Sequence, residues 1–208
     1  MNFHPITMPY LAAEPSAAAV MRRLGSKTER SEECFREDWY REALDHCCFR
    51  GVWRLLPAEE TKAGAESTLV ANILKNCPWC LFMAVTAGPE ITEWIRGLFA
   101  SGNGAKAAFA DAVASEGVEA AMNTMQKTVT GNLFRSGISV KKARISPGFG
   151  DFALDSQPDI LQLLDAEKIL GITLNNVFFM TPEKSTTALT GAFDIINSIE
   201  TGNTDDTE

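Results

Sequence analysis

Along the chain, apolar positions form either helical repeats or short continuous runs, and the two kinds of segment alternate irregularly. After Pro89, apolar side chains recur three and four positions apart as far as residue 99, which predicts an amphipathic helix. Residues 81–85 are continuously apolar, as is typical of a strand buried on both faces. Residues 105–127 are rich in small side chains, which predicts a long helix packed closely against a neighbour.

Shorter segments complete the pattern and indicate an α+β fold. We expect a twisted, mainly antiparallel sheet with several flanking helices, because an antiparallel strand pair near the end disfavours a parallel sheet. The remaining predicted strands are an edge strand within 1–10, then 51–56, 138–146, and the pair 177–180 and 187–193. The remaining predicted helices are 15–24, 31–48 and 158–170. Residues 1–199 are expected to form one domain, and residues 200–208 a disordered acidic tail.

Composition narrows the class of protein. The chain has 208 residues, 45% of them hydrophobic and 22% charged, with a net charge of −8. An acidic chain is not expected to bind nucleic acid or an anionic membrane surface, and no apolar run reaches the roughly 20 residues that span a bilayer. Five cysteines and no recognisable secretion signal predict reduced thiols in a cytoplasmic protein.

The segment from 141 to 160 holds the strongest candidate site. Arg144 ends a basic, strand-like stretch, and a turn with Pro147, Gly148 and Gly150 follows it. Glycines allow a close approach to backbone amides, and a guanidinium suits a carboxylate. This chemistry fits an amino-acid-like or nucleoside ligand. The alternative is an ordinary strand–turn–helix segment with an arginine on its surface.

Cys77 and Cys80 form a Cys-x-x-Cys pair. A redox dithiol needs its first cysteine at a helix N-terminus after a strand, whereas this pair precedes a strand. A zinc site needs two further ligands, and the neighbouring Cys47 and Cys48 would diverge on a helix. Structural thiols are therefore favoured, with redox or metal chemistry as the alternative.

Other sequence patterns give weaker evidence for a functional site. Residues 102–107 match Gly-x-Gly-x-x-Ala, but a dinucleotide fingerprint follows a strand and this segment follows a predicted helix. The two histidines are His4 and His46, and we expect His46, beside an apolar helix face, to pack structurally. The sequence offers no obvious self-sufficient catalytic set and no histidine-rich metal motif.

Residues 144–149, Arg-Ile-Ser-Pro-Gly-Phe, resemble the Arg-x-x-Pro-Gly-Tyr signature of the S-adenosylmethionine-binding activation domain of vitamin B12-dependent methionine synthase. Gly150, Asp151 and Gln157 are more similar to its free-standing, single-domain relatives. Weaker similarities occur in the family's order, at 20–25, 85–90, 111–120, 161–165, 171–174 and 178–182.

The resemblance implies a ligand and a partner. Arg144 would hold the carboxylate of S-adenosylmethionine, while Pro147, Gly148 and Phe149 would meet its adenosine. Cobalamin would be reached only through a partner protein, a corrinoid methyltransferase or methionine synthase module that is reductively remethylated in trans. A flavodoxin-type reductant and a homo-oligomer are further partners left open.

Two positions depart from the family. Phe149 replaces the tyrosine and lacks its hydroxyl, and Asn176 stands where the family commonly has a carboxylate. Three hypotheses follow: a ligand-binding activation-domain protein, a binding or scaffold protein that keeps the fold without the ligand, and a thiol protein that uses Cys77 and Cys80.

Overall fold

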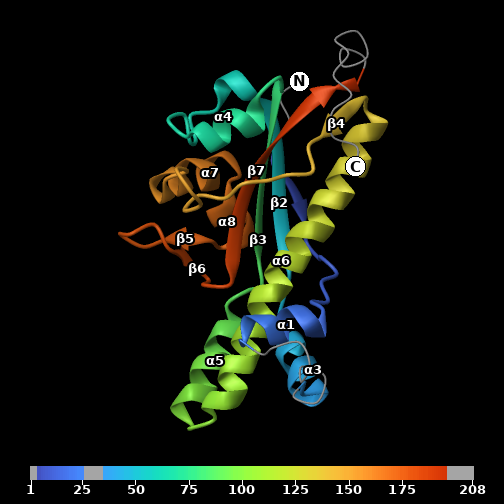
Figure 1. Ribbon diagram of the computed structural model, residues 1–208. Helices are drawn as coiled ribbons and strands as arrows, with labels where there is room; N and C mark the ends of the chain where they lie inside the picture. Colours follow the sequence, from blue (N-terminus) through green and yellow to red (C-terminus); the bar gives the residue numbers. More distant parts are fainter. Residues whose placement is uncertain (1–3, 26–34, 196–208) are drawn as a thin grey trace.

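The fold is built on a five-stranded antiparallel sheet, seen in a computed structural model that describes residues 4–25 and 35–195 (Figure 1). In spatial order, its strands are β1 (Ile6–Met8), β2 (Arg50–Pro57), β3 (Trp79–Thr86), β7 (Ser185–Asp194) and β4 (Ile138–Val140). A separate two-stranded hairpin joins β5 (Thr173–Leu174) to β6 (Met180–Thr181). The α+β class and the mainly antiparallel sheet predicted above are confirmed.

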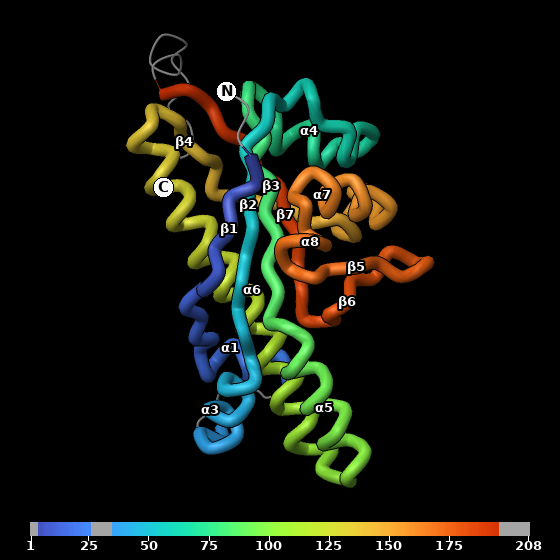
Figure 2. Tube along the Cα trace, turned by 180° about the vertical axis from the view of Figure 1, so that it is seen from behind, coloured from blue at the N-terminus to red at the C-terminus, as the bar shows by residue number. Residues whose placement is uncertain are grey.

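Helices cover both faces of the sheet (Figures 1 and 2). On one side lie α1 (Ala17–Arg23), α3 (Glu37–Asp45), α5 (Glu90–Ala100) and α6 (Gly104–Arg135). On the other side lie α4 (Thr68–Leu74), α7 (Gln157–Leu163), α8 (Ala166–Leu170) and the β5–β6 hairpin. Short 3-10 turns form at Ala58–Glu60 and Leu154–Ser156.

Strand β3 supplies side chains to two separate cores. Leu81, Met83 and Val85 point toward α6, while alternate residues point toward α7 and α8. Every residue from Cys80 to Val85 is completely buried. The continuous apolar run therefore reflects helices on both faces of an antiparallel strand.

The long helix α6 forms the spine of one face (Figure 2). Its small residues allow neighbours to approach closely, because a Cβ added at Gly117 would lie 2.5 Å from Cζ of Phe49. The prediction of close packing is confirmed, and the helix continues eight residues beyond its predicted end to Arg135.

Three predicted elements differ in length. The helix expected over 31–48 is α3, Glu37–Asp45, and residues 31–34 lie outside the described part of the chain. The helix expected over 158–170 breaks at Asp165, whose φ of 51° is left-handed. The strand expected over 138–146 ends at Val140, and only Ile145 pairs again, with Leu189.

The predicted pairing of 177–180 with 187–193 is wrong. Strand β6 pairs with β5, while β7 lies between β3 and β4. The Asn175 side chain accepts hydrogen bonds from the amides of Val177 and Phe179, and Phe178 takes a φ of 66°. The apolar residues Val177, Phe178 and Phe179 are therefore the exposed tip of a hairpin turn, with Asn176 beside them.

The predictions about the C-terminal tail and about membrane spans differ in whether the described residues test them. The predicted boundary at residue 199 and the tail at 200–208 lie outside those residues. Among the described residues, no helix combines the length and apolar character needed to cross a membrane.

Candidate functional site

Arg144 lies where the chain leaves β4 and crosses α6. One terminal nitrogen donates to Oδ1 of Asn123 at 2.7 Å and to Oε1 of Gln126 at 2.9 Å. The other donates to Oε2 of Glu119 at 3.1 Å, which makes an ion pair. The Arg144 side chain is 21% exposed. The guanidinium predicted to meet a carboxylate therefore already holds one, from its own chain.

The three partners of Arg144 differ in how firmly they are placed. Gln126 is buried and also donates to the carbonyls of Lys141 and Lys142, so it fastens this segment to α6. Glu119 and Asn123 lie nearer the solvent. Of the groups that hold Arg144, Glu119 and Asn123 are therefore open to solvent, whereas Gln126 is a buried anchor.

A second cation meets α6 further along. Lys184, just before β7, pairs with Oδ1 of Asp111 at 2.6 Å and donates to Oγ of Ser115 at 2.9 Å. Residues four apart share one side of a helix. Asp111, Ser115, Glu119 and Asn123 are spaced by four, and we call these four residues the α6 polar row. Arg144 and Lys184 approach the two ends of this row.

The turn after Arg144 runs in the direction of Lys184. Because Ile145 pairs antiparallel with Leu189, the following residues pass toward the start of β7. Gly148 has a φ of 89°, which favours glycine, and its amide donates to the carbonyl of Phe152 at 2.7 Å. Within the described residues, no strand pairs with the outer edge of β7 from Ser185 to Thr187. The Phe149 side chain is largely in solvent, at 67% exposure.

A hollow of about 410 Å³ adjoins Arg144 on the side away from the turn. Its lining includes four cations and no carboxylate, and neither Gly148 nor Phe149 contributes to it. The residues that line it are Asn123, Gln126, Lys127, Thr130, Val140, Lys141, Lys142 and Arg144. One side of the guanidinium therefore faces a basic surface in an acidic protein.

Asp151 caps a helix. Its carboxylate accepts from the hydroxyl of Ser67 at 2.7 Å, the amide of Thr68 at 2.7 Å and the hydroxyl of Thr68. These hydrogen bonds, led by the one from Thr68, hold the pKa of Asp151 well below its usual range. The adjacent Gly150 has a φ of 59°, and an added Cβ would collide with Leu69. Both residues join the turn to the start of α4.

Gln157 is buried at the start of α7. Its amide donates to the hydroxyl of Thr187 at 2.9 Å and contacts the sulfur of Met180. It ties α7 to β7 and to the β5–β6 hairpin. In this arrangement, Gln157 supports the site from within the core rather than facing a ligand.

The Cys-x-x-Cys thiols lie in the core. Cys77 and Cys80 are free, and burial raises the pKa of both thiols. Cys77 sits so close to β7 that a Cβ at Gly191 would lie 2.5 Å from its sulfur. No cluster of three or more metal-ligating side chains occurs among the described residues. This environment favours the structural interpretation over a reactive thiol.

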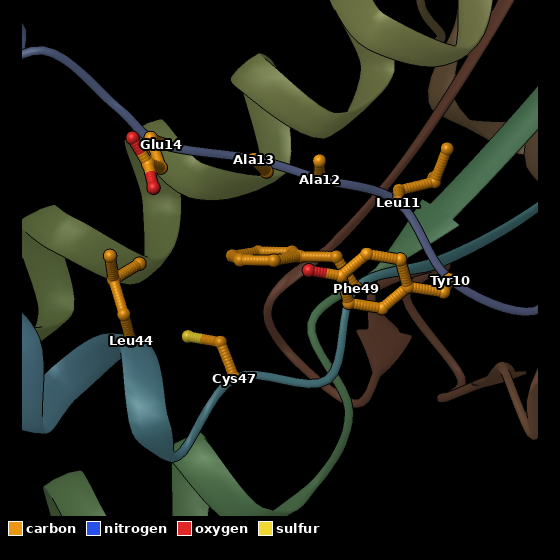
Figure 3. A pocket seen from close by; sticks show the side chains of 8 residues that line it. All are labelled: Tyr10, Leu11, Ala12, Ala13, Glu14, Leu44, Cys47 and Phe49. Atoms are coloured by element: carbon orange, nitrogen blue, oxygen red, sulfur yellow. The ribbon is translucent and has the colours of Figure 1, made fainter.

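A separate hollow of about 400 Å³ lies between the segment after β1 and the end of α3 (Figure 3). Leu11, Leu44 and Phe49 contribute apolar side chains to its lining, together with the Cys47 thiol and the Glu14 carboxylate. None of the predicted site residues lines it. Nearby, His46 stacks on Trp94 with ring centroids 4.4 Å apart, as a structural histidine would.

The sequence identified the cation at the site but not its partners. Glu119, Gln126 and Lys184 were assigned no role, because their positions depend on which segments meet. A signal was present in the spacing by four of polar residues along a helix otherwise rich in alanine.

Fold and geometry together define a class: an α+β protein with a five-stranded antiparallel sheet and an arginine-centred polar site against one long helix. No family model matches the sequence, and no curated protein matches it significantly. Among solved structures, the chain is similar to the crystal structure of the MetH reactivation domain bound to AdoHcy, with a TM-score of 0.65 and 15% identity. The match covers 93% of this chain and 79% of that one, so the two share a fold.

Proposed function

We propose that this chain is an activation-domain-like protein that binds S-adenosylmethionine or a close relative. It would support reductive remethylation of the cobalamin of a separate corrinoid methyltransferase. The observation that carries the proposal is Arg144, whose guanidinium holds an exchangeable carboxylate beside a glycine-containing turn. In the neighbour of known structure, the same fold binds AdoHcy, a ligand with an amino-acid end.

Charge exchange explains how such a ligand could bind. The ligand carboxylate takes the place of Glu119 on Arg144, and Glu119 then pairs with the ligand ammonium group. Both charges of Arg144 and Glu119 stay compensated, so no uncompensated charge is left in the site. A ligand with only a carboxylate or only an amine would lose this balance.

The direction of the turn suggests where the rest of the ligand goes. From Arg144, the turn and the α6 polar row both run toward Lys184, along the part of β7 whose edge has no described strand partner. An adenosine group in this region could meet the backbone of Pro147 and Gly148 and the exposed Phe149 ring. The corrinoid partner would approach the same edge.

A calorimetric titration of S-adenosylmethionine into the wild-type protein and Arg144→Ala tests the proposal. We expect binding that weakens about tenfold or more in the variant, because charge-assisted hydrogen bonds to the carboxylate are lost. Arg41→Ala is the matched control, since Arg41 pairs with Glu37 on the exposed surface of α3. Equal binding by wild type and Arg144→Ala would contradict this seat for the ligand.

The second candidate is a binding or scaffold protein that keeps the fold without the ligand. It is favoured by one observation: Glu119, Asn123 and Gln126 together already satisfy both terminal nitrogens of Arg144. If the wild-type protein gives no heat with the ligand, this candidate takes the place of the first.

A further inference from the structure

Lys184 introduces a fixed positive charge into the region assigned above to the ligand. Its side chain is only 13% exposed and is held by Asp111 and Ser115. Another titratable group that interacts with it is Cys47, two residues after the end of α3. Burial raises the pKa of this thiol to about 12, so it is neutral at physiological pH. Among the described residues, Asp111 is the carboxylate that pairs with Lys184.

Charges along the α6 polar row are matched one to one. Asp111 pairs with Lys184, and Glu119 pairs with Arg144. After the ligand carboxylate has displaced Glu119 from Arg144, the carboxylate of Glu119 pairs with the ligand ammonium group. No carboxylate of the row is left for a second positive charge on the ligand.

S-Adenosylmethionine brings this second positive charge as its sulfonium, whereas S-adenosylhomocysteine has a neutral thioether in its place. Resting on the proposed function, we propose that Lys184 makes the site select the neutral thioether over the sulfonium. The product of methyl transfer is then held more tightly than the methyl donor.

Helix geometry sets the distance over which this selection acts. Ser115, which binds Lys184, is one helical turn from Glu119, and the Cβ atoms of residues so placed are about 6 Å apart. A sulfonium that extends from Arg144 toward Lys184 would come close to a partly buried ammonium ion. At a partly buried position, repulsion over this distance, reduced by Asp111, corresponds to roughly fivefold in affinity.

The test is a pair of titrations, with S-adenosylmethionine and with S-adenosylhomocysteine, on wild type and two variants. Wild type should prefer the thioether about fivefold. Lys184→Met keeps a long side chain and removes the charge, so the preference should shrink toward one. Asp111→Asn leaves Lys184 uncompensated, so the preference should grow. Thermal melts of both variants establish that they are folded.

The outcomes separate this inference from the proposed function. If both ligands bind with equal affinity and neither variant changes the ratio, Lys184 selects nothing and the inference is overturned, while the proposed function stands. If wild type binds neither ligand, the proposed function itself fails. Opposite shifts of the affinity ratio in the two variants support the inference. A general loss of stability would instead weaken the binding of both ligands alike.

Discussion

The segment from 144 to 157 consists of two halves that do different work. In the first, Arg144 and the turn to Phe149 present groups that solvent can reach, and two of the three side chains that hold the guanidinium, Glu119 and Asn123, are exposed. In the second, Asp151, Phe152 and Gln157 are committed to α4, the core and β7. A short motif in a sequence can therefore contain both a candidate site and the supports that position it.

The difference predicts that changes in the second half reduce stability, whereas changes in the first half reduce binding. The expected loss of stability falls from Phe152 through Gln157 and Asp151 to Arg144.

Phe152→Ala should have the largest effect. Phe152 is completely buried, and such truncations cost about 3–5 kcal/mol. Denaturant unfolding measures this loss. The matched control is Phe149→Ala, three residues earlier, because that ring is exposed and its removal should change the free energy of unfolding little. Similar losses in both variants would remove the distinction between the halves.

Gln157→Ala should have the next largest effect. It leaves the buried hydroxyl of Thr187 without the amide that donates to it, at a cost of about 1–3 kcal/mol. Gln162→Ala on the exposed side of the same helix serves as control, and the two are compared by thermal melts. A Gln157 variant as stable as the control would mean that this residue does not tie α7 to β7.

Asp151→Asn should change how stability depends on pH. The folded-state pKa of Asp151 lies below the value of about 3.9 for an unfolded chain. Its contribution is therefore present above pH 4 and is lost as the pH falls through the folded pKa. We expect the variant to be less stable near neutrality and to lose less on acidification. Parallel curves of stability against pH for variant and wild type would contradict the role as a cap.

Arg144→Ala should have the smallest effect on stability, about 1 kcal/mol or less, because its ion pair with Glu119 is partly open to solvent. Chemical denaturation checks this value. The same variant should show the largest loss of ligand binding. A large loss of stability here would place Arg144 among the supports, with Gln157, rather than in the site.

The sequence predicted best where the signal is local. Residues 81–85 form a continuous apolar run and residues 90–100 follow a helical period, and both patterns reflect burial. The run at 177–180 misled because its apolar side chains cover no core and form an exposed turn. The break at Asp165 depends on a left-handed backbone at a non-glycine residue, which composition does not reveal.

The candidate site could be predicted only in part for a related reason. The guanidinium of Arg144 suits a carboxylate wherever it lies. The residue type and the glycine-containing turn after it were therefore sufficient to suggest a carboxylate partner. Its partner Glu119 lies 25 positions away, and Lys184 meets Ser115 across 69 positions. Such encounters are properties of the packed sheet and helices, and no local pattern encodes them.

Because α6 is unbroken, the spacing between the side chains on its surface is fixed by helix geometry. Eight residues separate Ser115 from Asn123, which corresponds to about 12 Å along the axis. One residue inserted between Ser115 and Glu119 would rotate everything beyond it by about 100° and lengthen the interval by about 1.5 Å. The partners of Lys184 and those of Arg144 would then lie on different sides of the helix. For the proposed ligand, which would extend from one cation toward the other, molecular length would be a criterion of recognition separate from charge and shape.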